Sequence, residues 1–481
     1  CARVFVKIIH YHRLAEAVYG TKTDITYSSL CNINVYAQGN NDMAQLTNIT
    51  IPINVVSQIR EFVAGNTYTT NYKYEGLRTH LQGLGILGFT SVESNNTTIG
   101  VKRKSTINSL HSTYFEPTRV TTITTQGGKT SSVETTISFV GKTSKSYFSY
   151  PSTIKNTDIY GDVVTTYNTY NTTYGYLTKQ RTEYGNSSMY KQTEYQSYAK
   201  AGGAYHPQTI IFTQKHEDAS DTFSRKTTYT YNTTNGVVSQ SIENASTKPI
   251  KHTYSYDAFG NMLTHTISAD GVPTIIATNT YDATHRFVAS QKFNANQLIA
   301  IYSYNNLGRL IESSQGVSGA MLKTTYTYDA IGNIATITHP DATKTTYTRG
   351  WGSTAKKRHY VTTSTTGVAP VTKWFDNIGR EVESTTKGAK NIAISSQKTY
   401  NNTLGTLANT ISSIGDLSAS TLYTYNELGL PTKVASSNGR TVTFSYARRK
   451  GTTTLVGRGT ITQTFDAWGG VKTSSSNSTS T

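Results

Sequence analysis

Cysteine, proline and charged residues are all scarce in this sequence. Only 15% of the 481 residues are charged, there are 9 prolines, and the two cysteines, Cys1 and Cys31, are too few to predict a disulfide framework. No run of 18 apolar residues occurs, so no transmembrane helix is expected. The composition therefore excludes a disulfide-stapled scaffold and a helical membrane protein.

The first 20 residues do not resemble a secretory signal. The apolar run Val4–Ile9 is short, is interrupted by Lys7 and is not followed by a small-residue cleavage site. An export signal, if one is used, is therefore expected outside this sequence. Cys1 fits either a lipidated bacterial terminus or the start of a fragment, and the fragment is the simpler interpretation.

Tyrosine is abundant, with 35 residues against 14 phenylalanines and 3 tryptophans, and threonine and serine are frequent. Tyr, Thr and Val favour a pleated, half-buried surface, so the composition predicts an all-β protein with polar sheet faces.

The formal net charge is +17. Its simplest meaning is a basic surface, and the alternative is an acidic partner such as an anionic glycan. Basic residues are scattered, and dense clusters such as Arg448–Lys450 are expected to be exposed turns. No known nucleic-acid module is present, so no specific nucleic-acid partner is expected.

The strongest feature is an internal repeat, Tyr-x-Tyr-Asp/Asn-x-x-Gly. Its clearest copies contain Tyr254, Tyr256, Asp257 and Gly260; Tyr302, Tyr304, Asn305 and Gly308; Tyr326, Tyr328, Asp329 and Gly332; and Tyr423, Tyr425, Asn426 and Gly429. Weaker copies are Tyr229–Asn232, Tyr281–Asp282, Trp374–Arg380, Tyr400–Asn401 and Phe465–Gly469. Most copies follow one another after 23 to 25 residues. Tyr347–Gly350 is a candidate degenerate copy in the longer gap between Tyr328 and Phe375.

Each part of the repeat has a physical role in a β-hairpin. Residues two apart in a strand share a face, so Tyr254 and Tyr256 are expected on the same side. Asp or Asn suits the start of a type I turn, and Gly three residues later can adopt φ > 0 in a three-residue loop. About ten such two-strand units would make a strip about 100 Å wide, which twist prevents from staying flat. The sequence therefore predicts a strip of antiparallel hairpins that coils into a spiral shell or tube.

The repeats are not evenly distributed along the chain. We predict an N-terminal segment of uncertain type over residues 1–80, a degenerate β-rich repeat region over 81–225, the regular repeat sheet over 226–472 and a flexible tail over 473–481.

These repeats resemble the YD repeats of Rhs proteins, of the BC components of Tc toxins and of teneurins. The stretch from Tyr74–Leu77 to Gly83–Phe89 is similar to a glycine-rich sequence that precedes the YD region in Tc-toxin-type proteins. The resemblance implies a β-sheet strip that spirals into a hollow shell, which can enclose a toxic domain or be displayed at a surface. The self-cleaving stretch that ends the family's shell does not occur in this sequence, so we expect no protease activity, plug or toxin from these residues.

Candidate chemical sites are few. Gly83–Gly88 matches a dinucleotide-binding fingerprint but lacks the βαβ context, and His10 and His12 have no further metal ligands nearby. Asp257, Asp282, Asp329, Asp376 and Asp466 could suggest acid–base chemistry, but each occupies a turn position of the repeat. We therefore expect no catalytic residue, no cofactor and no metal.

The leading hypothesis is a non-catalytic shell wall that encapsulates or displays a toxin or effector. Its expected partners are other shell-forming segments and the enclosed domain, and its expected location is secreted or at a bacterial cell surface. The alternative is a cell-surface adhesion or glycan-binding module, in which exposed tyrosines would stack on sugars.

Overall fold

The computed structural model describes residues 22–478 with the exception of 41–42, 142–145, 186–188, 218–219, 221, 246 and 295–296. The described residues form 36 strands, β1 to β36, and one 3₁₀ turn, Ala389–Asn391. None of the helical structure in these residues has the length and hydropathy to span a membrane. Cys1, His10 and His12 lie outside the described residues.

The strands have the following bounds. The first nine are β1 (Lys22–Ser29), β2 (Tyr36–Ala37), β3 (Leu46–Asn48), β4 (Asn54–Val63), β5 (Asn66–His80), β6 (Gly85–Asn96), β7 (Val101–Leu110), β8 (Pro117–Gln126) and β9 (Lys129–Gly141). The next nine are β10 (Tyr147–Thr157), β11 (Val163–Tyr170), β12 (Leu177–Tyr184), β13 (Tyr190–Ala201), β14 (Ala204–Lys215), β15 (Phe223–Tyr231), β16 (Val238–Glu243), β17 (Ile250–Tyr256) and β18 (Met262–Ala269).

The second half of the chain continues in the same way. It contains β19 (Val272–Tyr281), β20 (Val288–Phe293), β21 (Ile299–Tyr304), β22 (Leu310–Val317), β23 (Ala320–Tyr328), β24 (Ile334–Thr338), β25 (Lys344–Thr354), β26 (Lys357–Thr365) and β27 (Val371–Phe375). It ends with β28 (Glu381–Lys387), β29 (Ala393–Tyr400), β30 (Leu407–Ile414), β31 (Leu417–Tyr425), β32 (Pro431–Ser436), β33 (Thr441–Ala447), β34 (Lys450–Leu455), β35 (Gly459–Phe465) and β36 (Val471–Ser478).

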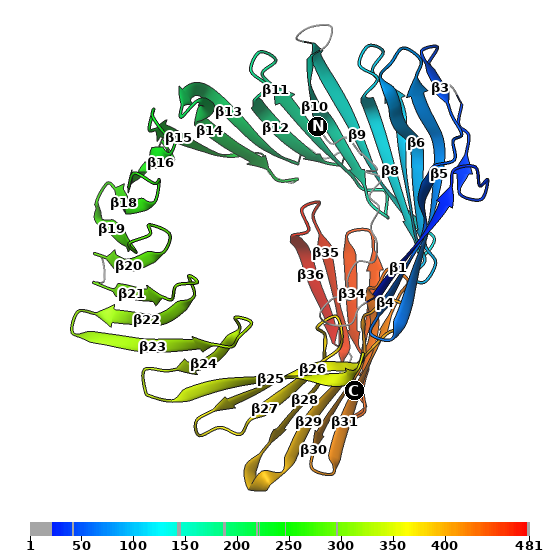
Figure 1. The fold of residues 1–481 in the computed structure, drawn as a ribbon. Helices are drawn as coiled ribbons and strands as arrows, with labels where there is room; N and C mark the ends of the chain where they lie inside the picture. Colours follow the sequence, from blue (N-terminus) through cyan, green and yellow to red (C-terminus); the bar gives the residue numbers. More distant parts are fainter. Residues whose placement is uncertain are drawn as a thin grey trace.

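The strands belong to one sheet in which, from β4 to β36, each strand pairs antiparallel with the next. Figure 1 shows the resulting ribbon of strands as a single layer that curves round on itself. This confirms the predicted all-β strip of antiparallel hairpins and its coiling. The curvature follows from the twist between neighbouring strands, which accumulates over a sheet of this width.

Antiparallel pairing gives the strip two distinct edges. The loops from odd-numbered to even-numbered strands lie at one edge, here called the YD edge because its loops begin at the repeat residues Asn171, Asn232, Asp257, Asp282, Asn305, Asp329, Asp376, Asn401, Asn426 and Asp466. The loops from even-numbered to odd-numbered strands lie at the opposite edge, and several are two-residue turns such as Ala64–Gly65 and Gly127–Gly128.

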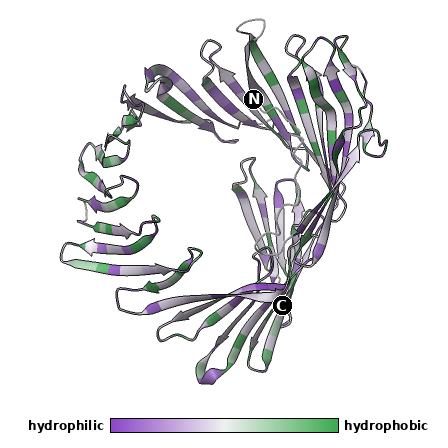
Figure 2. Cartoon of the chain, in the orientation of Figure 1, coloured by the Kyte–Doolittle hydropathy of each residue, from purple (hydrophilic) through white to green (hydrophobic). Residues whose placement is uncertain are grey.

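The only cluster of buried apolar side chains in the described part of the chain lies at the start of the strip. It consists of Leu30, Val35, Tyr36, Val55, Tyr74 and Leu77. β1 pairs with β4, and the short strands β2 and β3 extend along the second half of β5. Along the rest of the ribbon, hydrophobic and hydrophilic segments alternate (Figure 2). The strip is therefore held mainly by its strand ladders and by contacts between side chains on neighbouring strands.

Two expectations are corrected by the strand boundaries. Residues 473–478, expected in a flexible tail, belong to β36 and pair with β35, so the tail prediction is wrong for them. Tyr347–Gly350 is not a repeat loop, because β25 continues to Thr354 and the turn follows at 355–356. The Gly83–Gly88 stretch forms a turn and the start of β6, with no helix after it, which agrees with the missing βαβ context. The division at residues 80 and 225 stays a prediction.

The repeat glycines provide a test of the loop geometry. Gly308 and Gly429 occupy equivalent positions with φ of 76° and 78°, where alanine is strained by about 1–2 kcal/mol. A Cβ at Gly308 would also clash with the Phe287 ring. A Cβ at Gly429 would have no other atom within 4 Å. We expect Gly308→Ala to lower the thermal midpoint more than Gly429→Ala. Equal effects in differential scanning calorimetry would contradict this packing.

Candidate functional site: the YD loops and the seam between turns of the sheet

The YD loops share one hydrogen-bonding scheme. In the loop after Tyr256, the Asp257 N–H donates to the Asn261 carbonyl and the Gly260 N–H donates to the Asp257 carbonyl. One oxygen of the Asp257 carboxylate accepts from the N–H groups of Phe259 and Asn261, at 2.9 Å each. Gly260 has φ of 86°, which confirms the predicted three-residue loop with glycine in the left-handed region.

The same scheme recurs at the other clear copies. Asn305, Asp329 and Asn426 begin their loops as Asp257 does, and Gly308, Gly332 and Gly429 have φ of 76°, 94° and 78°. The weaker copies at Asn232 and Asn401 have loops one residue longer. In them the N–H that donates to the asparagine carbonyl belongs to a glycine four residues later, Gly236 or Gly405. A longer loop, and not loss of the loop, therefore explains why these copies look irregular in the sequence.

The second tyrosine of the repeat links its strand to the strand before it. The Tyr256 hydroxyl donates to the carbonyl of Val238, the first residue of β16, at 2.8 Å. Backbone pairing between β16 and β17 starts only at Gln240, so the phenol satisfies a carbonyl that this ladder leaves out. Equivalent bonds of 2.7–3.1 Å join Tyr281 to Met262, Tyr304 to Val288, Tyr328 to Leu310 and Tyr400 to Glu381.

The first tyrosine of the repeat lies on the same face as the second. In the β17 copy the ring centroids of Tyr254 and Tyr256 are 6.5 Å apart, and Tyr254 stacks on His265 of β18 at 4.8 Å. Tyr302, Tyr326 and Tyr423 occupy the equivalent positions in β21, β23 and β31. These rings are partly buried, and the Tyr326 hydroxyl lies 3.3 Å from the Ser313 hydroxyl of the neighbouring strand.

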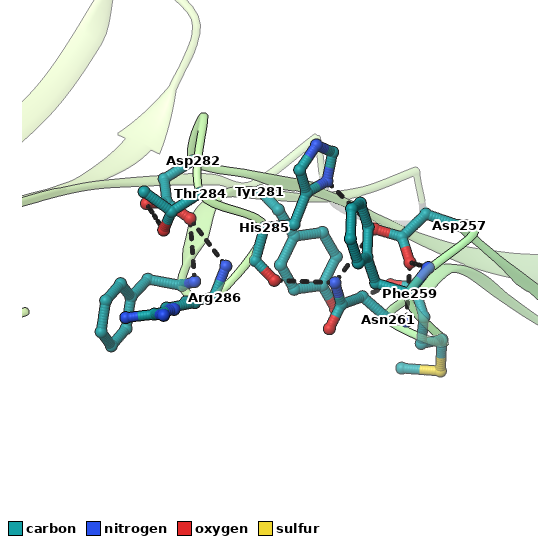
Figure 3. Close-up of polar contacts among 10 residues, drawn as sticks. Asp257, Phe259, Asn261, Tyr281, Asp282, Thr284, His285 and Arg286 are labelled. Atoms are coloured by element: carbon teal, nitrogen blue, oxygen red, sulfur yellow. Dashed lines mark hydrogen bonds and ion pairs between the residues drawn. The ribbon is translucent and has the colours of Figure 1, made fainter.

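Neighbouring YD loops also contact each other along the edge (Figure 3). The Asn261 amide donates to the His285 carbonyl at 2.8 Å, and the rings of Phe259 and His285 stack with centroids 4.5 Å apart. His285 adopts φ of 57° at the position where other copies have glycine. These two successive loops thus contact each other directly at this edge of the strip.

Hydrogen bonds lower the pKa of three repeat carboxylates, those of Asp257, Asp282 and Asp329. Hydrogen bonds from the Thr284 hydroxyl and the Phe287 N–H lower the pKa of Asp282 to about 2. Burial acts to raise the pKa of Asp257, but hydrogen bonds from Asn261 and Phe259 outweigh it and lower that pKa. Carboxylates occupied as turn acceptors are suited to holding a loop, not to moving a proton during catalysis.

The coil brings the two edges of the strip together in a seam. The β4–β5 turn meets the β27–β28 loop, the β8–β9 turn meets the β31–β32 loop, and the β10–β11 loop meets the β33–β34 turn. Each partner follows 23 strands later, for example from β4 to β27. The paired residues are 286 to 313 apart in sequence. The opposite edge of the first turn of the coil therefore rests on the YD edge of the second.

The β4–β5 turn is the most buried part of the seam. The Ala64 N–H donates to the Asn377 side-chain carbonyl at 2.6 Å, and Asp376 and Asn377 are only 1% and 3% exposed. Arg380 neutralises Asp376 through an ion pair of 2.8 Å and also donates to the Gly405 carbonyl of the next YD loop. The buried aspartate is thereby paired and hydrogen-bonded, as a buried charge requires.

A charged cluster closes the far end of the seam. Asp162 accepts from the Arg448 Nε at 3.0 Å and from Arg449 at 3.3 Å, and Arg449 also lies 3.8 Å from Glu217. The hydrogen bond from Arg448 is the largest effect that lowers the pKa of Asp162, against burial, and the charges of both arginines add to it.

An aromatic contact lies beside this charged cluster. Trp468 of the β35–β36 loop packs against the rings of Tyr184 and His216, with centroids 6.0 and 4.2 Å apart. The Lys191 ammonium group lies over the same indole at 4.4 Å. Residues from the ends of β12, β13 and β14 thus surround a side chain of the last YD loop.

Sequence reasoning located the YD loops but not the seam. Arg448–Lys450 was expected to be an exposed turn; it is a turn, but Arg449 is largely covered and both arginines bind Asp162. No spacing in the sequence signals a pair separated by 286 residues. Within the part of the chain that the structure describes, no group of His, Cys, Asp and Glu side chains could hold a metal ion.

The fold and the loops together define a strip of antiparallel hairpins whose loops carry the repeat residues. Residues 13–122 match the family described as insecticide toxin TcdB middle/N-terminal region, and residues 304–344 match the RHS repeat. The chain therefore carries a TcdB-type region followed by an RHS repeat, which confirms its resemblance to YD-repeat (Rhs) proteins. No curated protein matches this chain.

One solved structure with a TM-score above 0.5 shows the same fold. The structure described as TcdB2-TccC3-TEV has a TM-score of 0.65 at 9% sequence identity, over 94% of this chain and 37% of that chain. A Photorhabdus luminescens Tc holotoxin pore with a TccC3 mutation has a TM-score of 0.43 at 11% identity, over 89% of this chain and 24% of that one. The chain thus spans little more than a third of the length of the TcdB2-TccC3-TEV chain.

The phenol hydrogen bond can be tested within one repeat. Tyr304→Phe removes the bond to the Val288 carbonyl and should cost about 1 kcal/mol, the typical net value of a hydrogen bond. It should also speed amide hydrogen exchange in β20 to β22. Tyr302→Phe is the matched control, because Tyr302 lies on the same strand two residues before it. Equal losses of stability in the two variants would show that the second tyrosine has no special role in linking the strands.

The charged end of the seam should depend on the ionised form of Asp162. A carboxyl whose pKa is lowered by folding stabilises the folded state above its unfolded pKa, near 3.8, and loses that contribution as the pH falls through the folded value. Asp162→Asn should therefore lower the thermal midpoint by a constant amount above about pH 5, and the difference from the wild type should disappear in stronger acid.

Asp158→Asn is the control for this experiment, because Asp158 accepts the N–H groups of Tyr160 and Asp162 in its own loop and an amide oxygen can replace it. Faster hydrogen exchange at both β10–β11 and β33–β34 in Asp162→Asn would locate the loss at the seam. A pH-independent difference would show that the charge is not what matters.

Proposed function

We propose that this chain is part of the wall of a shell that encloses a toxin or effector polypeptide, and that it performs no chemistry itself. The observation that carries the proposal is the seam. A strip that coils and rests its opposite edge on its own YD edge, with a constant offset of 23 strands, makes a continuous curved wall.

The loop chemistry supports a structural role. The repeat aspartates are used as turn acceptors, and the second tyrosine of several repeats uses its hydroxyl to link strands. The side chains that looked most reactive in the sequence are thus committed to holding the sheet. This supports a wall that has no active site of its own.

The similarity to a chain from a TcdB2-TccC3 structure supports the same function. Because the present chain spans 37% of that chain, we propose that further shell segments complete the wall and that the enclosed polypeptide is supplied separately or from another part of a longer protein. The TcdB-type region, described for an insecticide toxin, supports a secreted or surface-displayed bacterial protein.

The adhesion alternative would need exposed aromatic rings in a groove. The hydroxyls of Tyr256, Tyr304 and Tyr328 are engaged with backbone carbonyls, which leaves them poorly placed to bind a sugar. The surplus of 17 positive charges remains the observation in favour of an anionic glycan.

Electron microscopy of the purified protein with everything that copurifies tests the proposal. We expect curved walls that enclose density not belonging to this chain. Limited proteolysis should degrade the enclosed polypeptide only after the wall is opened, for example in Asp162→Asn. An open strip with no enclosed density, together with binding of heparin to the wild type, would replace encapsulation by adhesion.

A further inference from the structure

Two histidines meet on the tyrosine-bearing face of the strip. His252 of β17 and His265 of β18 lie diagonally across their hairpin, and the Nδ1 atom of His252 is 3.0 Å from the Nε2 atom of His265. Their rings stack with centroids 5.2 Å apart, and Tyr254 stacks on His265 at 4.8 Å. These two residues, here called the histidine pair, join the strands of the hairpin through a hydrogen bond between ring nitrogens.

This hydrogen bond depends on how many protons the pair holds. A bond between two imidazoles needs one nitrogen that carries a proton and one that does not. The condition is met when both rings are neutral and when the pair holds one extra proton. When both rings are protonated, every ring nitrogen carries a proton, so the bond is lost and two positively charged rings face each other across 3.0 Å. The geometry therefore accommodates at most one positive charge.

The surroundings favour one proton over two. The Oε1 atom of Glu243 in β16 lies 3.8 Å from Nε2 of His252, the ring nitrogen that does not contact His265. A single positive charge on the pair thus has a carboxylate beside it. Burial lowers the pKa of His265 below its ordinary value of 6.5, and the charge of His252 lowers that pKa further. A second proton is therefore disfavoured in the folded sheet.

The other neighbours of the pair do not compensate a second charge. Ile267 of β18 and Ala277 of β19, which pair with His252 and His265, do not titrate. Over β15 to β19, the other charged or titratable side chains on this face are Arg225 and the tyrosines Tyr229, Tyr231, Tyr254, Tyr256 and Tyr281. Arginine is positive and tyrosine is neutral in mild acid, so Glu243 is the carboxylate that balances the pair here.

We propose that the histidine pair makes this stretch of the strip acid-sensitive: it holds β17 to β18 at neutral pH and releases the β16–β18 segment in mild acid, when both rings are protonated. Histidine is the side chain whose charge ordinarily changes in this pH range. The strip is a single layer here (Figure 1), so a lost contact between strands is not offset by a core. Loosening β17 also frees the Tyr256 hydrogen bond to β16.

The direction of the pH dependence follows from the pKa of His265. Because folding lowers this pKa below 6.5, the opened segment binds more protons in mild acid than the folded sheet does. The contribution of the pair to stability is therefore complete well above pH 6.5, decreases as the pH falls through 6.5, and stops decreasing below the pKa of the folded state.

This inference concerns the sheet alone. A wall that encloses a polypeptide would open at the β16–β18 segment in acid, and that consequence rests on the proposed function. Hydrogen exchange in the segment responds to acid whether or not anything is enclosed, so the two proposals fail separately.

Hydrogen–deuterium exchange of the full chain, corrected for the intrinsic pH dependence of amide exchange, tests the inference. Between about pH 7.5 and about pH 5.5 we expect opening of β16–β18 to increase by up to about tenfold, the most that one proton gives one pH unit below 6.5. His265→Gln puts an amide that does not titrate in place of the ring and should abolish this increase.

His339→Gln is the matched control. His339 lies 3.0 Å from the Thr345 hydroxyl, which can donate or accept, so protonation of this histidine does not require the contact to break. The variant should keep the wild-type acid response in β16–β18. Loss of the response in His339→Gln as well would show that it does not come from the histidine pair.

Glu243→Gln tests the role of the carboxylate. Its removal makes even the first proton unfavourable in the folded sheet, so acid should open β16–β18 more than in the wild type. No acid response in the wild type, an equal response in His265→Gln, or a smaller one in Glu243→Gln would overturn the proposal. Circular dichroism at neutral pH checks that each variant is folded, and His252→Gln, with the same expected result, replaces His265→Gln if that variant is not.

Discussion

The hydrogen bond from the second repeat tyrosine to the strand before it is the interaction on which the strip depends. Near the YD edge, the first residues of an even-numbered strand do not pair with the next hairpin. In β16, which begins at Val238, pairing with β17 starts only at Gln240. The phenols of Tyr256, Tyr304 and Tyr328 satisfy the carbonyls left there. Without them, a row of hairpins would have polar gaps between its units, since a single layer has little apolar burial to offset them.

A single-layered sheet also exposes the loops at its two edges. In the coil, the loops of one edge pack against the loops of the other. At two contacts the YD loops present carbonyl oxygens to donors of the other edge, from Ala64 and Gln126, and at a third the arginines of the YD edge donate to Asp162. Because the two edges are complementary, successive turns of the coil can rest on each other without a second layer. The same loop therefore closes a hairpin and forms an interface: Asp376 accepts N–H groups within the loop, and Asn377 accepts the Ala64 N–H across the seam.

Prediction from the sequence succeeded where the structure is local. The hairpin loops followed from residue types that have few alternatives: a carboxylate or amide that caps a turn, and a glycine that adopts positive φ. It failed where a neighbouring strand decides the outcome. Tyr347 looks like a repeat tyrosine but lies within β25, and the serines after Thr473 look like a tail but pair with β35. Backbone pairing does not require a distinctive side chain, so neither was visible beforehand.

The amino-acid sequence by itself determined the repeating hairpin, its loop and therefore a long antiparallel strip, because each depends on residues a few positions apart. Only the tertiary structure decided which loops meet. The pairing of Ala64 with Asn377, and of Asp162 with Arg448, depends on how far twist has turned the sheet after 23 strands. That angle is the sum of many small rotations between strands, and no residue or spacing encodes it.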